Sequence, residues 1–144
     1  MAQLKLAALD EQDLTILSAH VQDAVMKVRD LQYMAAARRF LVPMNRFAWE
    51  TQTGFFRKTP ERRNAVLQVD RVGAVKFSGI ARDRPDETLN LLAVGFEGGD
   101  APAGTVNLVF SGGGAIRLEV ECVEARLADL GGAWEASSRP RHRL

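Results

Sequence analysis

The chain has 144 residues, about the length of one domain, and its 47% hydrophobic and 26% charged residues are ordinary for a soluble globular protein. Its 19 basic and 18 acidic residues leave a net charge of +1, which gives little long-range attraction to nucleic acid or to an anionic membrane. The single cysteine, Cys122, excludes an intrachain disulfide and multi-cysteine zinc clusters, and two histidines make a metal centre hard to assemble. The sequence therefore predicts a cytoplasmic protein with no metal, no cofactor and no membrane segment.

The N-terminal part of the chain predicts a short strand followed by a helix. Residues 3–9 alternate between apolar and polar side chains, which is typical of an edge strand. Asp10 suits a helix N-cap, and Asp13 follows at the third helical position, as in a variant of the capping box. Apolar residues then recur every three or four positions from Leu14 to Val25, so we expect an amphipathic helix of about fifteen residues.

The middle of the chain changes to a period of two, which predicts antiparallel strands. They are expected around residues 26–33, 40–44, 67–69, 72–77 and 92–96, and the third and fourth could also be one kinked strand. Phe47 and Trp49 continue the second of these strands on the opposite parity. We therefore expect a bulge or bend near Asn45.

The last third of the chain has the clearest pattern. Apolar residues alternate along 105–110 and again along 116–120, on either side of the three glycines at 112–114, which predicts a β-hairpin. Residues 123–130 are rich in Ala, Leu, Glu and Arg and predict a C-terminal helix. Cys122 is expected to point inward just before that helix.

Together these elements predict an α+β fold. Its sheet would be a strongly bent antiparallel sheet or small barrel of about seven strands, with an N-terminal helix and a C-terminal helix. The pleckstrin-homology-like barrel has this order of elements, and an open sheet with both helices on one face is the alternative. No linker divides the chain, so residues 1–135 are expected to form a single domain, followed by a basic, disordered tail at 136–144.

Four stretches of the sequence carry a resemblance to a known family. They are residues 14–25 (LTILSAHVQDAV), 38–50 (RRFLVPMNRFAWE), 69–75, and 104–130, which contains FSGGGAIRLEVECVEARLADL. With them the chain resembles the alphaproteobacterial family catalogued as domain of unknown function 2948, from about Leu4 to about Trp134. The resemblance implies a single small bacterial domain. It carries no activity, substrate or site residues with it.

Basic residues crowd the segment 38–71, where aromatic side chains are interleaved with them. Arg39, Arg46 and Arg63 could form a site for a small anionic ligand or for single-stranded nucleic acid. The alternative is a sheet face of Arg–Glu cross-strand pairs. Acidic neighbours and the balanced net charge make nucleic acid the less favoured ligand.

Aromatic residues in the same region indicate a second candidate surface. Phe55 and Phe56 stand side by side in a polar segment, and either fold back over the end of a barrel or stay exposed. If exposed, they and Trp49 would mark a surface for a protein partner or a homodimer. His20 and Asp23 could share one helix face for proton transfer, although no nucleophile is placed beside them.

These observations favour binding over catalysis. We expect no catalytic residue, and a non-enzymatic binding or adaptor domain that acts through protein contacts. Binding of an anionic ligand or nucleic acid at the arginine-rich segment is the alternative function.

Overall fold

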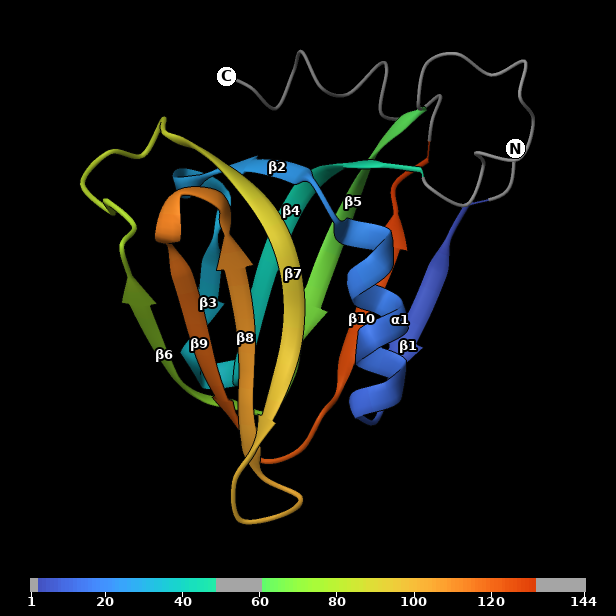
Figure 1. Cartoon of the computed structure of the whole chain (residues 1–144), viewed down its shortest axis with the longest axis vertical. Helices are drawn as coiled ribbons and strands as arrows, with labels where there is room; N and C mark the ends of the chain where they lie inside the picture. The colour runs from blue at the N-terminus through green and yellow to red at the C-terminus, as the bar shows by residue number, and fades with distance from the viewer. Residues whose placement is uncertain (1–2, 49–60, 132–144) are drawn as a thin grey trace.

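The computed structural model describes residues 3–48 and 61–131, which form ten strands and one α-helix (Figure 1). In chain order the elements are β1 (Lys5–Ala8), α1 (Glu11–Val21), β2 (Ala24–Lys27), the 3-10 turn η1 (Val28–Asp30), β3 (Gln32–Met34), the 3-10 turn η2 (Ala35–Ala37), β4 (Arg39–Phe47), β5 (Arg62–Val69), β6 (Val72–Ser78), β7 (Thr88–Gly98), β8 (Gly104–Phe110), the 3-10 turn η4 (Ser111–Gly113), β9 (Ala115–Val120) and β10 (Ala125–Asp129).

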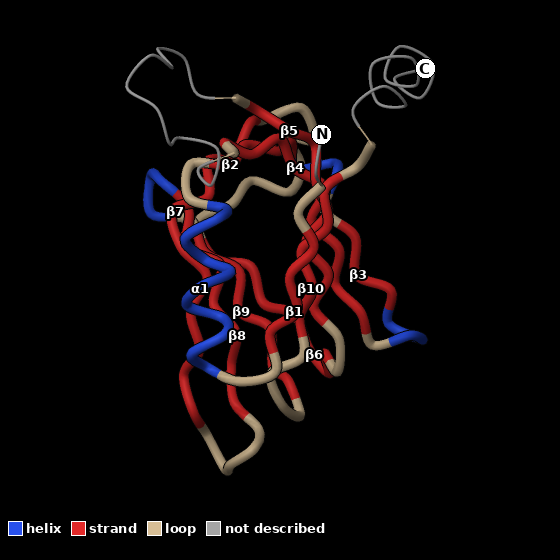
Figure 2. The backbone as a smooth tube through the Cα atoms, turned by 90° about the vertical axis from the view of Figure 1, so that its right-hand side faces the viewer, coloured by secondary structure: helices blue, strands red, loops and turns tan. Residues whose placement is uncertain are grey.

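The strands of the described residues belong to one antiparallel sheet. Their order is β1-β10-β5-β4-β2-β7-β8-β9-β6, and β3 pairs with β4 off this path. The sheet is therefore open, with β1 and β6 at its ends, and it curls so that its two wings face each other (Figure 2). The wings meet where β2 pairs with β4 at a single position, Val25 opposite Asn45.

Helix α1 begins where the sequence predicts. The Asp10 carboxylate accepts a hydrogen bond from the Asp13 N–H at 2.8 Å, and the Asp13 carboxylate accepts one from the Leu9 N–H at 3.1 Å. The helix is shorter than expected, at 11 residues, because the chain turns extended at Gln22 and left-handed at Asp23, whose φ is 65°. No helix in the described ranges is long and apolar enough to cross a membrane.

The helix covers the part of β7 that β2 leaves unpaired. Beyond Leu91, β7 has β8 on one side and α1 on the other. Leu14, Leu17 and Val21 face the core there, and the Ser18 hydroxyl accepts a hydrogen bond from the Val94 N–H at 2.8 Å. The helix thus supplies both apolar cover and a partner for an edge N–H.

The predicted hairpin is confirmed as β8 and β9. Alternate residues of both strands are buried in the core, namely Val106, Leu108, Phe110, Ile116, Leu118 and Val120. The turn between them needs positive φ angles of 81° at Gly112 and 90° at Gly113, which glycine adopts without a steric penalty.

The predictions of about seven strands, a C-terminal helix and a pleckstrin-homology-like barrel are wrong. The sheet is larger and open, and Ala125–Asp129 form β10, which lies between β1 and β5. Helix propensity differs by only about 0.7 kcal/mol among ordinary residues, so hydrogen bonds to strands on both sides outweigh it. Cys122 is half-buried in the connection before β10 rather than at the start of a helix.

The bulge expected near Asn45 is also wrong. Strand β4 pairs with β5 in unbroken register, from Phe40 opposite Val69 to Phe47 opposite Arg62. The inward row of β4 therefore runs through its apolar residues and continues with Arg46. A charged side chain at an inward position is what breaks the apolar alternation in the sequence.

Candidate functional site

Arg46 forms an ion pair with Asp129 inside the curled sheet. Arg46 lies on β4 and Asp129 on β10, and β5 separates the two strands. Nε and Nη2 of Arg46 donate hydrogen bonds to Oδ1 and Oδ2 of Asp129 at 2.8 and 2.9 Å. Both side chains have an exposed fraction of 0%, so the pair is removed from solvent.

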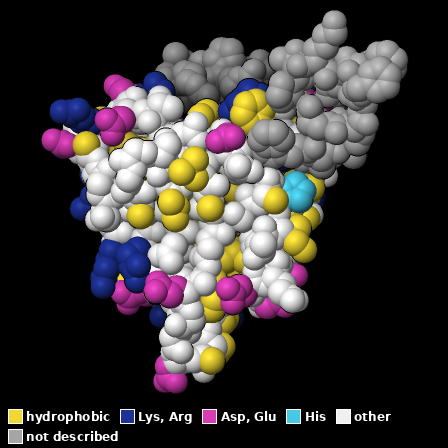
Figure 3. All heavy atoms as spheres, viewed as in Figure 1, with side chains coloured by type: hydrophobic (Ala, Val, Ile, Leu, Met, Phe, Trp, Pro, Cys, Tyr) yellow, Lys and Arg dark blue, Asp and Glu magenta, His cyan; other side chains and the backbone are white. Residues whose placement is uncertain are grey.

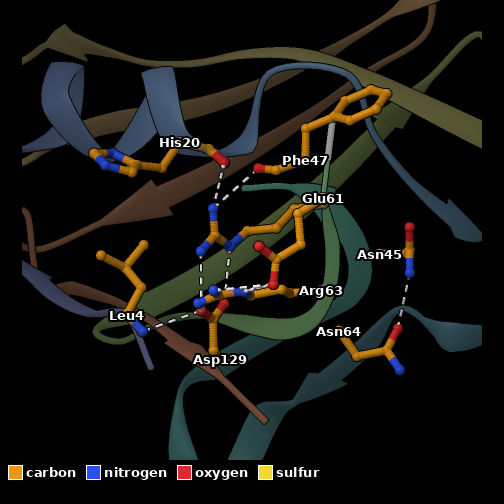
Figure 4. A network of polar contacts seen from close by, with 9 residues as sticks. Leu4, His20, Asn45, Phe47, Glu61, Arg63, Asn64 and Asp129 are labelled. Carbon is orange, nitrogen blue, oxygen red and sulfur yellow. Dashed lines mark hydrogen bonds and ion pairs between the residues drawn. The ribbon is translucent and has the colours of Figure 1, made fainter. Parts of the chain in front are cut away.

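Further groups complete a polar cluster around this pair (Figure 4). Nη1 of Arg46 donates to the carbonyl of Phe47 at 3.0 Å, and Nη1 of Arg63 lies 3.3 Å from Asp129 Oδ2. Arg63 also pairs with Glu61 at 3.1 Å, so two guanidinium groups stand beside two carboxylates. The charges of the cluster balance.

The pKa of Asp129 lies below the ordinary value of an aspartate. Burial alone would raise this pKa, but the hydrogen bonds from Arg46, the Leu4 N–H and Arg63, together with the charge of Arg46, stabilise the carboxylate and lower the pKa overall. Asp129 is therefore held ionised, and its oxygens already accept donors from three residues. The cluster has the properties of a structural ion pair.

Arg39 lies apart from Arg46 and Arg63, at the opposite end of β4. It donates from Nε to Asp70 at 2.8 Å, and the Gln68 amide donates to the same carboxylate at 3.0 Å. Burial raises the pKa of Asp70, but these two hydrogen bonds and the charges of Arg39 and Arg126 together lower it below the ordinary value of an aspartate. The structure thus brings together two of the three arginines that the sequence analysis grouped.

The other residues singled out from the sequence are placed as follows. Trp49, Phe55 and Phe56 fall outside the described residues, so the partner surface expected there stays a prediction. Nδ1 of His20 lies 2.9 Å from the carbonyl of Ile16, one turn earlier in the same helix, and the ring points away from the polar cluster (Figure 4).

A pocket of about 270 Å³ lies where the sheet ends at β6. Its apolar wall consists of Val28, Leu31, Phe40, Phe77 and Pro85, and its polar lining of Arg29, Tyr33 and Arg82. The rings of Phe40 and Phe77 meet edge to face, with their centroids 6.5 Å apart. The elements η1, β3, β4 and β6, the connection between η1 and β3, and the loop after β6 therefore contribute to one small, mainly apolar hollow.

The pocket exists because two strand edges remain open beside each other. Strand β6 pairs with β9, strand β3 pairs with β4, and neither pairs with the other. At the start of β6, the Tyr33 hydroxyl of β3 donates to the Val72 carbonyl at 3.1 Å. The Val72 N–H donates to the carbonyl of Arg38, which directly precedes β4, at 2.8 Å. Further along β6, Phe77 lines the pocket instead.

Two arginines of the pocket differ in their partners. Arg29 forms an ion pair with Asp86 at 2.5 Å. The guanidinium of Arg82 lies over the Phe77 ring, 4.5 Å from its centroid, and forms no ion pair with any residue of 3–48 or 61–131. This site is not visible in the sequence, because no local pattern shows that Tyr33, Phe77 and Arg82 converge.

A comparison with protein families places the chain among known sequences. The model of the family described as "Protein of unknown function (DUF2948)" matches residues 4–142. No curated protein and no solved structure matches the chain significantly.

Proposed function

The chain belongs to the DUF2948 family of proteins of unknown function, and we propose that it is a non-enzymatic binding domain. Its pocket beside β6 receives an apolar side chain of a protein partner. The observation that carries this proposal is the apolar wall formed by Phe40, Phe77 and their neighbours, which opens to solvent beside an unpaired strand edge.

The size of the pocket supports a single side chain as its occupant. Its volume of about 270 Å³ lies below the roughly 300–1,000 Å³ of pockets that enclose drug-sized ligands. A leucine or phenylalanine side chain needs less room and can bury most of its apolar surface there. Burying such a side chain contributes about 1.5–3 kcal/mol, enough to anchor a contact.

The chemistry of the pocket supports recognition. Its polar side chains are the guanidinium groups of Arg29 and Arg82 and the phenol of Tyr33. A guanidinium group stays protonated and charged near neutral pH. The Tyr33 hydroxyl already donates to a backbone carbonyl. These groups can orient a ligand by hydrogen bonds and charge.

The alternative function, anion binding at Arg39, Arg46 and Arg63, has less geometric support. Arg46 and Arg63 are bound to Asp129, and Arg39 is bound to Asp70. An incoming anion would have to displace a buried carboxylate. Charge reversal at Arg46 would consequently unfold the protein before it reported on binding.

An NMR titration of the ¹⁵N-labelled full chain tests the proposal. N-acetyl-phenylalanine amide serves as the probe, and N-acetyl-alanine amide as the matched control. We expect the phenylalanine probe to shift amide signals of Leu31, Tyr33 and Phe77, with much smaller shifts from the alanine probe. Equal responses to the two probes, or shifts spread over the whole sheet, would contradict the proposal.

Two variants localise the response. Leu31→Trp fills part of the pocket and should weaken the titration. The control is Val109→Trp on β8, where Val109 is 41% exposed. Figure 3 shows that apolar side chains reach the surface on this side of the molecule, which is the side viewed in Figure 1. Val109→Trp should leave the titration unchanged. If Val109→Trp abolished the response and Leu31→Trp did not, the binding surface would be the β7–β8 face.

A further inference from the structure

We propose that the partner segment is an extended acidic peptide that adds to the sheet as a strand beside β6. One large apolar side chain of this peptide enters the pocket, and a nearby carboxylate pairs with Arg82. This inference rests on the proposed function and specifies the partner for it.

The open edge of β6 provides the template for a strand. Val72–Ser78 hydrogen-bond to β9 along one edge, and along the other edge no strand of the described ranges pairs with them. Such an edge presents backbone N–H and C=O groups that an extended peptide can complete. The first residue of the strand, Val72, is already bonded to the Arg38 carbonyl and the Tyr33 hydroxyl, so the free edge runs over residues 74–78. This stretch contains no proline, and its one lysine, Lys76, is paired with Glu119 on the sheet face.

The alternation of β6 decides which side chains of the peptide face the pocket. Val75 and Phe77 point toward the core side of β6, where they are partly buried against the core. A strand added beside β6 directs every second side chain to this same side. One apolar residue of the peptide would then lie next to Phe77, and its two sequence neighbours would face outward.

The position of Arg82 selects a carboxylate beside the apolar anchor residue of the peptide. Arg82 lies over Phe77 and forms no ion pair within the described ranges, whereas its neighbour Arg29 is neutralised by Asp86. A carboxylate near the apolar anchor residue would pair with this guanidinium at the edge of an apolar pocket, where charge-assisted hydrogen bonds are strong. A lysine or arginine at that position of the peptide would meet repulsion from Arg82.

Selection of peptides on the full chain tests the acidic preference. A phage-displayed library of 12 randomised positions with a central phenylalanine is selected in parallel on the wild-type protein, Arg82→Gln and Arg84→Gln. Arg84 lies in the same loop but does not line the pocket, so it is the matched control. We expect Asp and Glu to be enriched near the phenylalanine on the wild-type and Arg84→Gln proteins only.

The selected peptide then measures the strength of the pairing. Its affinity should fall about three- to tenfold for Arg82→Gln, and the affinity for wild type should fall with rising salt. The affinity for Arg84→Gln should stay within about twofold of wild type. Enrichment of acidic residues that survives in Arg82→Gln would overturn the role of Arg82.

Backbone methylation of the selected peptide tests strand addition. One derivative carries N-methyl groups at odd positions and the other at even positions, so that each removes alternate donors. Because a strand pairs with β6 through alternate residues, one derivative should lose at least about tenfold in affinity and the other should bind nearly as before. Equal losses from both derivatives would overturn strand addition.

The outcomes distinguish a failure of this inference from a failure of the proposed binding function. If N-acetyl-phenylalanine amide binds in the pocket but no acidic strand-forming peptide is selected, the inference is wrong and the binding function stands. If the amide also fails to bind, the proposed function is wrong as well.

Discussion

Arg46 and Asp129, 83 residues apart in sequence, form a two-point ion pair in the interior of the sheet, with hydrogen bonds of 2.8 and 2.9 Å. They extend from β4 and β10, so the pair spans the intervening strand β5 on its inner face. Each occupies the inward position that follows a run of apolar core residues on its strand. The ion pair therefore fixes the relative position of three strands at one end of the core.

Removing one partner of this pair should strongly destabilise the protein. Arg46→Met leaves the buried carboxylate of Asp129 with only Arg63 and a backbone N–H as partners. We expect the free energy of unfolding, measured in urea, to fall by about 3–5 kcal/mol.

The double variant Arg46→Met/Asp129→Leu is the matched control for that loss. It replaces both charges with apolar groups, so most of the lost stability should return. The single variant Asp129→Leu is measured as well. If the double variant loses as much free energy of unfolding as Arg46→Met and Asp129→Leu lose together, the two residues do not act as a pair.

The lowered pKa of Asp129 predicts a specific pH dependence of stability. The folded protein favours the carboxylate more than the unfolded chain does, whose aspartate pKa is about 3.9. The stabilisation is therefore complete above about pH 4 and is lost as the pH falls further, through the pKa of the folded state. In urea unfolding, the stability difference between wild type and Asp129→Asn should narrow between pH 6 and pH 3.

The exposed carboxylate of Asp83, in the loop between β6 and β7, offers a control for this titration. Asp83→Asn should differ little from wild type at any pH in this range. A difference for Asp129→Asn that stays constant down to pH 3 would show that its carboxylate is not stabilised in the fold.

Ser18→Ala should weaken the contact between α1 and β7 and lower the stability of the protein. The variant removes the acceptor for the Val94 N–H at a position where β7 has no neighbouring strand on that side. We expect a loss of about 1–2 kcal/mol and faster hydrogen exchange at the Val94 amide. Thr15→Ala is the control, because the Thr15 hydroxyl only bonds back to the exposed Glu11 carbonyl. Unchanged exchange at Val94 would refute the contact.

Much of the fold follows from local patterns that physical chemistry makes unambiguous. Asp10 and Asp13 fix the start of α1 because short acidic side chains accept hydrogen bonds from the free N–H groups of a helix. Gly112 and Gly113 fix the β8–β9 turn because their φ angles are positive. These signals concern neighbours in sequence and need no knowledge of the rest of the chain.

The C-terminal strand and the buried ion pair could not be predicted from local patterns, and the reason is the same for both. An alternating run ends with Arg46 on β4 and with Asp129 on β10, both facing inward. Each charge disguises the period of two in its own strand. The signal in the sequence is that two alternating runs end in opposite charges. This signal indicates an ion pair only when the two strands are known to lie close together.

The pocket could not be predicted because no single segment contains it. Tyr33, Phe77 and Arg82 come from β3, β6 and the loop after β6, and each looks ordinary in its own segment. Their convergence depends on β6 ending the sheet. The position of β6 at the end of the sheet is a property of the topology. The expected barrel covered by a C-terminal helix did not predict an open edge at this strand.

The most direct test of the proposed binding domain is photo-cross-linking in the native cells. The photoreactive residue p-benzoylphenylalanine replaces Tyr33 beside the pocket in one variant and Val109 on the outer face of β8 in another. We predict that the Tyr33 variant cross-links to a distinct protein through a short acidic segment, identified by mass spectrometry, and that the Val109 variant does not. Cross-linking from Val109 alone would contradict the assignment of the pocket as the binding site.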